Sequence, residues 1–494
     1  MKRKQGIFKN KIYAHFDDRK KIKNIKKYVY NTKKVKERSF LPFILDIHKM
    51  ERFDRENYIK IKKNKEIGKE EKELKVYNEK KRNIMFSSHL DRYIYQLYNN
   101  KLNRTYNEYA KKIGINKCSI AYRNNFAGKS NINFAHDVFK FILGTKTSFI
   151  LVGDFKDFFE GLDHNYLKKM ICKMQGKHNL DEDYYAVYKN ITKYTYFDLN
   201  DICKLKGINR RDIYKYTVRI NDNTGKKEYI FELEKIMNIE EIKKYKPKYL
   251  HYNGKYGIPQ GSAISSVLSN IYMIDADKLI NELITSHNGL YRRYSDDFIV
   301  VIPDTNKEEF KNILDEVKEI LIQNGNPELK DEKTRVYYYE ENTLENTNKE
   351  FLPDIDNTKN ELEYLGFCFT GDKIKIRDKT MSKFYYRMYK KIKTIALAHG
   401  KTRNGNKITG KNLYKLYSEY GKNDERGNFI TYNERCEKVF EDLDGVFISY
   451  KNRFLKKLKN RYNKEMDKYK NTDTKKYYGV LKNKKTVNKM VNGN

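Results

Sequence analysis

Two adjacent aspartates between two strand-like segments constrain the fold of this chain more than any other feature. Asp296 and Asp297 lie between residues 289–293 and the apolar run 298–302. Side chains alternate between the faces of an extended strand, so the pattern predicts a hairpin that carries both carboxylates at its tip. Neighbouring carboxylates repel each other, and a cation that prefers oxygen ligands, such as Mg2+ or Mn2+, relieves that repulsion. An isolated Asp-Asp pair is more often a solvated acidic turn, so its meaning depends on other motifs.

Four further motifs accompany this turn. Upstream, a short apolar strand ends in Asp154, and a loop with glycine, proline and serine, residues 257–266, leads into a helix-like segment. Small residues in such a loop let a template and its base pair lie close to the backbone. Downstream, Lys333 is followed by a threonine, and a Leu-Gly pair lies within residues 363–367.

In this order the five motifs resemble the palm of reverse transcriptases: a first aspartate, a Pro-Gln-Gly loop, a Tyr-x-Asp-Asp turn, a lysine motif and a Leu-Gly primer-grip hairpin. The resemblance covers about residues 81–370. Three details are most similar to prokaryotic, defence-associated (antiviral) reverse transcriptases, and fit retron and group II intron enzymes less well. They are Gly-Ile-Pro-Gln-Gly-Ser at 257–262 with Ser-Asn-Ile-Tyr-Met at 269–273, Ala-Tyr-Arg at 121–123 with Gly-Lys-Ser-Asn at 128–131, and Asn-Phe-Ile-Thr-Tyr at 428–432.

The resemblance implies a site for two divalent ions, Mg2+ with Mn2+ able to substitute. Two such ions about 4 Å apart activate the attacking oxygen and neutralise the leaving group in phosphoryl transfer. Asp154 and Asp296 are the implied ligands. Asp297 is a weaker ligand or an electrostatic support, because adjacent residues in a turn need not face the same way. The backbone carbonyl of Phe155 would complete the coordination of the nucleotide-side ion.

The resemblance also implies residues that bind the nucleotide. Arg123 and Lys129 would neutralise the triphosphate, although either could be one more nucleic-acid contact in a basic protein. Asp157 reads as a polar support near the nucleotide, with a solvated face as the alternative. Phe159 would lie beneath the sugar and exclude ribonucleotides, and Gln260 would contact the sugar and steady the templating pair.

The predicted site is completed by four residues that lie downstream of the Asp-Asp turn in the sequence. Lys333 matches the lysine that protonates the departing pyrophosphate in the family. Leu365, Gly366 and Phe367 would shape the primer grip, although an ordinary core hairpin would look similar in sequence.

The charge of the chain predicts a polyanionic partner. The 494 residues carry a formal net charge of +37, with a pI near 9.5. Residues 19–38 contain ten lysines and arginines and a single acid, Glu37. Part of this excess could reflect A·T-rich coding, but phosphate contacts that make binding salt-dependent are the expected consequence.

Other classes of protein are disfavoured. None of the five cysteines forms a C-x-x-C pair, so neither a zinc module nor a disulfide framework is expected. No apolar run approaches the roughly 18 residues of a membrane span, and no apolar signal core follows the first residues. We therefore expect a cytoplasmic protein without a membrane partner.

The expected fold is α+β: a right-hand polymerase whose palm is an antiparallel sheet flanked by helices, with mixed fingers and a helical thumb. The predicted parts are a basic N-terminal extension (1–80), fingers (81–150), a palm (151–370) with an insertion of unassigned role at about 176–250, a helical thumb (371–458) and a basic C-terminal tail (459–494).

The predicted function is RNA-directed DNA synthesis from dNTPs, with a template RNA and a structured non-coding RNA as partners, in antiphage defence. A homo-oligomer is possible. The alternatives are a retron or group II intron type enzyme, untemplated or protein-primed synthesis that uses one of the 43 tyrosines, and an inactive nucleic-acid-binding scaffold. The intact set of motif residues argues against the scaffold, because a dead site has no physical need for all of them.

Overall fold

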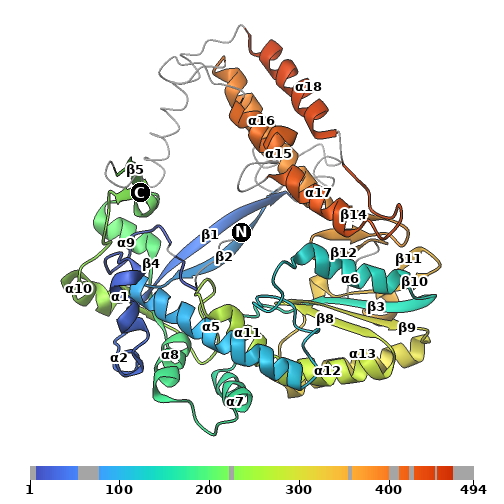
Figure 1. Ribbon diagram of the computed structural model, residues 1–494, viewed down its shortest axis with the longest axis horizontal. Coiled ribbons are helices and arrows are strands. Elements are labelled where there is room, and N and C mark those ends of the chain that lie inside the picture. The colour runs from blue at the N-terminus through green and yellow to red at the C-terminus, as the bar shows by residue number, and fades with distance from the viewer. Residues whose placement is uncertain are drawn as a thin grey trace, which may run out of the picture.

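The computed structural model describes residues 7–9, 11–53, 77–221, 227–353, 359–399, 411–421, 428–450 and 453–470. Of the predicted C-terminal tail, residues 471–494 lie outside the described residues, as do residues 54–76 of the predicted N-terminal extension. The α+β polymerase fold is confirmed: a palm sheet, a fingers region and a helical thumb are distinct in Figure 1.

A five-stranded antiparallel sheet forms the palm, in the order β11-β10-β3-β9-β8. Its strands are β3 (Thr147–Asp154), β8 (Leu290–Tyr294), β9 (Asp297–Pro303), β10 (Arg335–Glu340) and β11 (Thr343–Asn346). The β3 and β9 strands are almost continuously apolar because the sheet is covered on both faces. They pair from Ser148 opposite Pro303 to Asp154 opposite Asp297.

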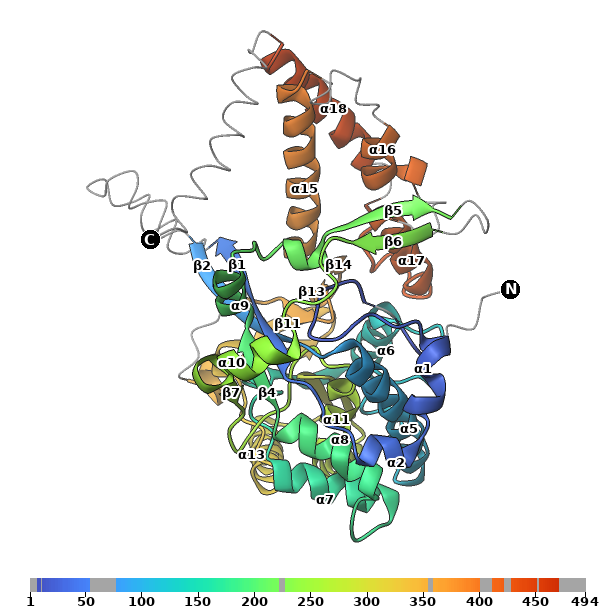
Figure 2. The ribbon, with the colours of Figure 1, turned by 90° about the vertical axis from the view of Figure 1, so that its left-hand side faces the viewer.

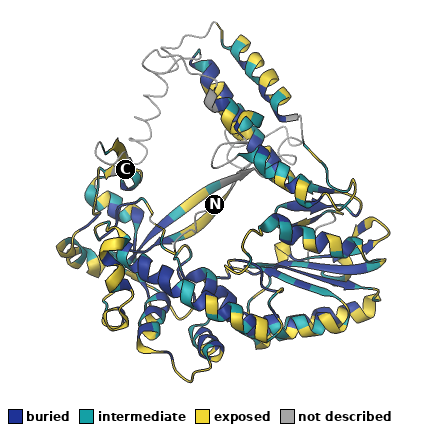
Figure 3. Ribbon diagram, in the orientation of Figure 1, coloured by how far each residue is buried: buried dark blue, intermediate teal, exposed yellow. Residues whose placement is uncertain are grey.

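Helices bury both faces of the palm sheet. On one face, Phe149, Leu151 and Val300 pack with apolar residues of α12 (Ile274–Ser286) and α13 (Lys307–Gln323). On the other face, Ile150 and Val301 pack against α6 (Asn131–Leu143). The alternation of partners along β3 is the two-residue period of an extended strand. Figure 3 shows the buried strands between half-exposed helices.

The fingers contain a second sheet, in the order β2-β1-β4-β7. Its strands are β1 (Phe43–Phe53), β2 (Tyr77–Phe86), β4 (Thr195–Asp198) and β7 (His251–Tyr252). Helices α5 (His89–Lys112), α7 (His164–Gln175) and α11 (Ser265–Tyr272) pack against one another and share a hydrophobic cluster with the palm.

The segment predicted as a palm insertion packs on the fingers. It forms α8 (Glu182–Thr192), β4, α9 (Leu199–Lys206), the 3-10 helix η1 (Asp212–Tyr214), β5 (Tyr216–Ile220), β6 (Lys227–Phe231) and α10 (Ile239–Tyr249). Strand β4 runs parallel to β1, and Tyr214 donates a hydrogen bond of 3.1 Å to Asp46 in β1. Phe197 and Ile213 share a hydrophobic cluster with Tyr13. The β5–β6 hairpin projects from this part of the molecule (Figure 2).

The basic segment 19–38 forms two short helices, α1 (Ile22–Val29) and α2 (Thr32–Lys36). Val29 and Val35 are buried, whereas most of the lysines are exposed. Arg38 instead forms an ion pair of 2.5 Å with the buried Asp91 of α5. The segment is therefore an amphipathic cover on the fingers with a basic outer surface.

The thumb is helical, as its apolar period predicts. It contains α15 (Asp378–Leu397), α16 (Lys411–Tyr417), η3 (Glu419–Gly421), α17 (Phe429–Val439) and α18 (Arg453–Lys468). Met388 and Ile392 of α15 bury against Leu458 of α18. Figure 2 shows the thumb standing above palm and fingers.

Short elements join the palm to the thumb. They are α14 (Asn348–Phe351) and a three-stranded sheet of β12 (Leu362–Tyr364), β13 (Phe367–Phe369) and β14 (Ile374–Ile376), whereas the 3-10 helix η2 (Asp331–Lys333) precedes β10 within the palm. Among the described residues, no helix has both the length and the apolar character needed to cross a membrane.

Gly153 lies at a close contact in the palm core. A Cβ atom there would lie 2.4 Å from two ring atoms of the buried Phe298, which pairs with it across the strands. We expect Gly153→Ala to lower the free energy of unfolding by roughly 1–3 kcal/mol through overpacking. Chemical denaturation measures this change. The control is Gly144→Ala, whose Cβ would approach nothing closer than 3.4 Å. Equal stability of the two variants would contradict this account of the core.

Candidate active site

Pairing of β3 with β9 brings the three predicted carboxylates to one end of the palm sheet. Asp154 is the last residue of β3, and Asp297, its register partner, is the first residue of β9. The backbone N–H of Phe155 donates a hydrogen bond of 3.0 Å to the carbonyl oxygen of Asp296. The main chain that carries the first aspartate is thus bonded directly to the turn that carries the second.

The turn between β8 and β9 is two residues long. It consists of Ser295 and Asp296, and Ser295 has a φ of 63°. This left-handed conformation is uncommon for residues other than glycine, and it is maintained only where the surroundings support it. Ser295 is 2% exposed, so the support comes from packing beneath the turn.

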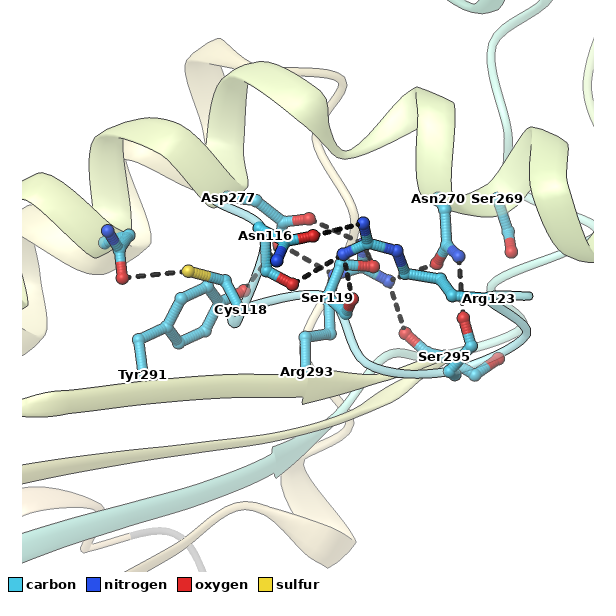
Figure 4. Close-up of polar contacts among 12 residues, drawn as sticks. Asn116, Cys118, Ser119, Arg123, Ser269, Asn270, Asp277, Tyr291, Arg293 and Ser295 are labelled. Atoms are coloured by element: carbon cyan, nitrogen blue, oxygen red, sulfur yellow. Dashed lines mark hydrogen bonds and ion pairs between the residues drawn. The ribbon is translucent and has the colours of Figure 1, made fainter. Parts of the chain in front are cut away.

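A buried ion pair that sequence analysis missed lies under this turn. Arg293 of β8 and Asp277 of α12 are both fully buried, and the guanidinium Nη2 lies 2.6 Å from the carboxylate (Figure 4). The sequence did contain a signal for a buried arginine, the pair Arg292-Arg293, because successive residues of a strand face opposite sides of the sheet. Nothing in the sequence placed Asp277 opposite Arg293.

The carboxylates are crowded and partly neutralised. Burial and the nearby Asp296 and Asp154 raise the pKa of Asp297 to about 7, and Lys333 opposes that rise. The Nζ atom of Lys333 forms an ion pair with Asp154. The donor set and its mutual repulsion suit a divalent cation chemically. Among the described residues, however, no three His, Cys, Asp or Glu side chains lie close enough together to hold one.

The predicted sugar-binding residues lie beside the Pro-Gln-Gly loop. Phe158 is buried in the core, whereas Phe159 is partly exposed. The carbonyl oxygen of Phe159 accepts a hydrogen bond of 2.8 Å from the N–H of Ile258. The carbonyl oxygen of Gln260 accepts one of 2.8 Å from Met85 of β2, so the loop also touches the fingers sheet. Asp157 has a φ of 42° in the tight turn that follows β3.

The two cations predicted for the triphosphate have partners within the protein. Arg123 donates to the side chain of Asn107 at 2.8 Å, to both oxygens of Asn116 and to the carbonyl of Ser119. It is 9% exposed and holds the fingers loop together. Lys129 is more exposed and lies 3.5 Å from Asp137. Their contact with a triphosphate stays a prediction, and for Arg123 it would require internal hydrogen bonds to break.

The predicted primer grip is a two-residue turn between β12 and β13. Leu365 and Gly366 have φ values of 46° and 93°, and Phe367 is buried. Asn131 donates a hydrogen bond of 2.9 Å to the carbonyl of Leu365 and one of 3.4 Å to the hydroxyl of Tyr432. The structure therefore brings the Gly-Lys-Ser-Asn segment and the Asn-Phe-Ile-Thr-Tyr segment to the same turn. The two residues that meet, Asn131 and Tyr432, are 301 residues apart in the sequence, so the sequence alone did not predict this contact.

Residues 222–369 match the family model described as reverse transcriptase (RNA-dependent DNA polymerase). The match includes Gln260, Asp296, Asp297, Lys333 and the primer-grip turn, and it begins after Asp154. No curated protein matches the chain.

Solved structures similar to the chain include two yeast telomerases. The apo telomerase from Candida tropicalis, truncated from the C-terminal domain, has a TM-score of 0.38 and 14% identity over 61% of this chain and 53% of its own. The telomerase from Candida albicans, in complex with the TWJ fragment of telomeric RNA, has a TM-score of 0.35 and 16% identity over 91% of this chain and 64% of its own. The chain thus spans less than two thirds of either telomerase.

The raised pKa of Asp297 predicts how metal-free protein responds to pH. Between the ordinary value of 3.8 and about 7, the folded state holds a proton that the unfolded state has released, so stability falls as pH rises through this window. We expect Asp297→Asn to flatten that fall, measured as unfolding midpoints in chelator from pH 4 to pH 8. Asp444→Asn, at an exposed position, is the control and should keep the wild-type slope. A wild-type slope in Asp297→Asn would contradict the assignment.

Proposed function

We propose that this chain is an RNA-directed DNA polymerase, a nucleotidyltransferase that extends a primer with dNTPs on an RNA template at the Asp154–Asp296–Asp297 site. The observation that carries the proposal is the register of β3 and β9, which sets Asp154 opposite Asp297 at the sheet end. Antiparallel pairing makes this juxtaposition rigid, because both strands are buried on both faces.

Asp154 and Asp296, supported by Asp297 and the carbonyl of Phe155, would hold two Mg2+ ions, for which Mn2+ can substitute. When bound, such ions activate the primer hydroxyl and neutralise charge on the phosphates. The ion pair that Lys333 forms with Asp154 would then give way, because Asp154 would serve as a metal ligand. Lys333 would turn toward the pyrophosphate and donate its proton there, as general acids do to a leaving group.

The remaining predicted residues would orient primer and nucleotide. The Leu365–Gly366 turn, held by Asn131, would support the primer end. Gln260 of the Pro-Gln-Gly loop and Phe159, whose carbonyl accepts a hydrogen bond from the Ile258 N–H of that loop, would contact the sugar, with Asp157 as a polar support nearby. Lys129 is exposed enough to reach a triphosphate without disturbing the core.

The biological role that we propose is antiphage defence in a prokaryotic cytoplasm, with a structured non-coding RNA as partner. The support is the similarity of residues 121–123, 128–130 and 428–432 to defence-associated enzymes, together with the net charge of +37. Retron or group II intron type synthesis, tyrosine-primed or untemplated synthesis and an inactive scaffold are the alternatives.

One experiment separates these roles. The protein is purified with its co-bound RNA and supplied with labelled dNTPs and Mg2+, and both the RNA and the DNA product are sequenced. A product complementary to the bound RNA supports templated synthesis. DNA that stays attached to the protein after protease-free denaturation supports tyrosine priming, and bound RNA without any incorporation supports the scaffold.

We predict that Asp154→Asn and Asp296→Asn each abolish incorporation while RNA affinity stays nearly unchanged. Each substitution removes one carboxylate from the site and leaves the basic surface intact, and losing one such electrostatic contribution costs at least about 100-fold in rate. Asp304→Asn is the matched control, because Asp304 is exposed just beyond the opposite end of β9. Substantial incorporation by either site variant at saturating Mg2+ would overturn the assignment.

A further prediction concerns the choice of sugar. Phe159 is the partly exposed member of the Phe158-Phe159 pair, so its ring is the one available to meet a ribose 2′-hydroxyl. We expect Phe159→Ala to raise rNTP use relative to dNTP use by at least about tenfold, measured as a ratio of kcat/KM values. Phe158→Ala should mainly reduce stability, since it removes a buried ring. If Phe158→Ala is the variant that admits rNTPs, the proposed orientation of this turn is wrong.

A further inference from the structure

Arg293 is a fully buried cation whose charge is matched by one carboxylate. Its Nε donates to Oδ1 of Asp277 at 2.8 Å and its Nη2 to Oδ2 at 2.6 Å, so the contact is a two-bond fork. Tyr291 donates a further hydrogen bond of 2.8 Å to the same carboxylate. Both charged side chains are 0% exposed. A buried pair of this kind rarely adds net stability over apolar packing, so its hydrogen-bond geometry is the property to explain.

The same guanidinium reaches the catalytic turn. Its Nη1 donates a hydrogen bond of 2.9 Å to the carbonyl oxygen of Ser295, the residue with the left-handed φ. That carbonyl belongs to the peptide unit that joins Ser295 to Asp296. Any displacement of this carbonyl therefore moves the main chain of Asp296 and, with it, the carboxylate assigned to the metal site.

Arg293 also joins the turn to two other parts of the site. Its Nη2 donates to the Ser119 hydroxyl at 3.2 Å, and its Nη1 lies 3.4 Å from Oδ1 of Asn270 in α11. The Arg293 backbone donates to Cys118 at 2.8 Å and accepts from Ile120 at 3.0 Å. Figure 4 shows these groups converging on Arg293 from β8, α12, α11 and the loop before Arg123.

We propose that Arg293, oriented by Asp277, is a positioning residue that sets Asp296 at a fixed place relative to fingers loop 116–123. This inference rests on the proposed polymerase function. The planar fork of arginine serves the carboxylate, the turn carbonyl and the serine hydroxyl at once, which a lysine ammonium on a flexible stem cannot do in the same geometry. Misplacement of a reacting group by about 1 Å can cost about 100-fold in rate.

The test compares Arg293→Lys with Arg292→Lys. Arg293→Lys keeps a positive charge beside Asp277 but gives up the link to the turn. Arg292 is its neighbour on the opposite face of β8, where its Nη1 donates to the carbonyl of Tyr291 at 2.8 Å. The measurements are kcat and KM for dNTP, the Mg2+ concentration at half-maximal rate, RNA affinity and the unfolding midpoint.

For Arg293→Lys we expect kcat to fall at least about tenfold and the half-saturating Mg2+ concentration to rise several-fold, with RNA affinity within about twofold of wild type. Arg292→Lys should leave all of these within about twofold. A purely structural role would instead lower the unfolding midpoint and the active fraction together, with the Mg2+ dependence of the folded enzyme unchanged. That result, or an unchanged kcat, would overturn the proposal.

Ser119→Ala keeps the proposal testable if Arg293→Lys does not fold. This substitution removes the small, buried hydroxyl that accepts the hydrogen bond from Nη2 of Arg293. We expect a reduction of kcat by about twofold to fivefold with unchanged RNA affinity. Wild-type kcat and Mg2+ dependence in Ser119→Ala would then overturn the link to the fingers loop. If wild-type protein with its RNA and Mg2+ incorporates no dNTP, the proposed function itself is wrong. If wild-type protein is active and the variants are equally active, only the positioning role of Arg293 is wrong.

Discussion

The antiparallel pairing of β3 with β9 is the interaction on which the rest of this structure depends. Its register places Asp154 opposite Asp297, and the bond from Phe155 to the Asp296 carbonyl carries the pairing into the turn. A slip of one residue would send every side chain of one strand to the opposite face. The separate hydrophobic clusters on the two faces of the sheet make such a slip costly, so the core that stabilises the palm also maintains the carboxylate geometry.

Clustered negative charge is the electrostatic cost of this arrangement. The pKa of Asp297 is raised by burial and by its acidic neighbours, and Lys333 at Asp154 offsets part of the repulsion. A second cation, Arg293, lies beneath the turn but is matched entirely by Asp277. The two cations thus have different contacts: Lys333 pairs with the carboxylate of Asp154, whereas Arg293 donates a hydrogen bond to the Ser295 carbonyl of the turn.

The fingers are assembled from segments that are distant in the sequence. Residues 13–16, strand β1, strand β4 and η1 share one hydrophobic cluster, and Asp46 in β1 forms an ion pair with Arg210. Arg123 has a comparable role nearby, since its hydrogen bonds close the loop from Asn116 to Ser119. Loops that position functional groups are usually held by such a rigid scaffold. The basic helices α1 and α2 lie on the outside of this assembly, where their lysines are exposed and Lys36 pairs with Glu182 of α8.

Sequence alone determined the polymerase motifs, the right-hand fold class and the helical thumb, because these follow from local patterns: a strand that ends in an aspartate, two carboxylates in a turn, and apolar residues at helical spacing. The tertiary structure alone decided which residues meet. Asp277 opposite Arg293, Asn131 at the Leu365 turn, and β4 beside β1 are contacts between segments far apart in the chain. They arise from packing and charge pairing across elements, which leave no periodic trace in the sequence.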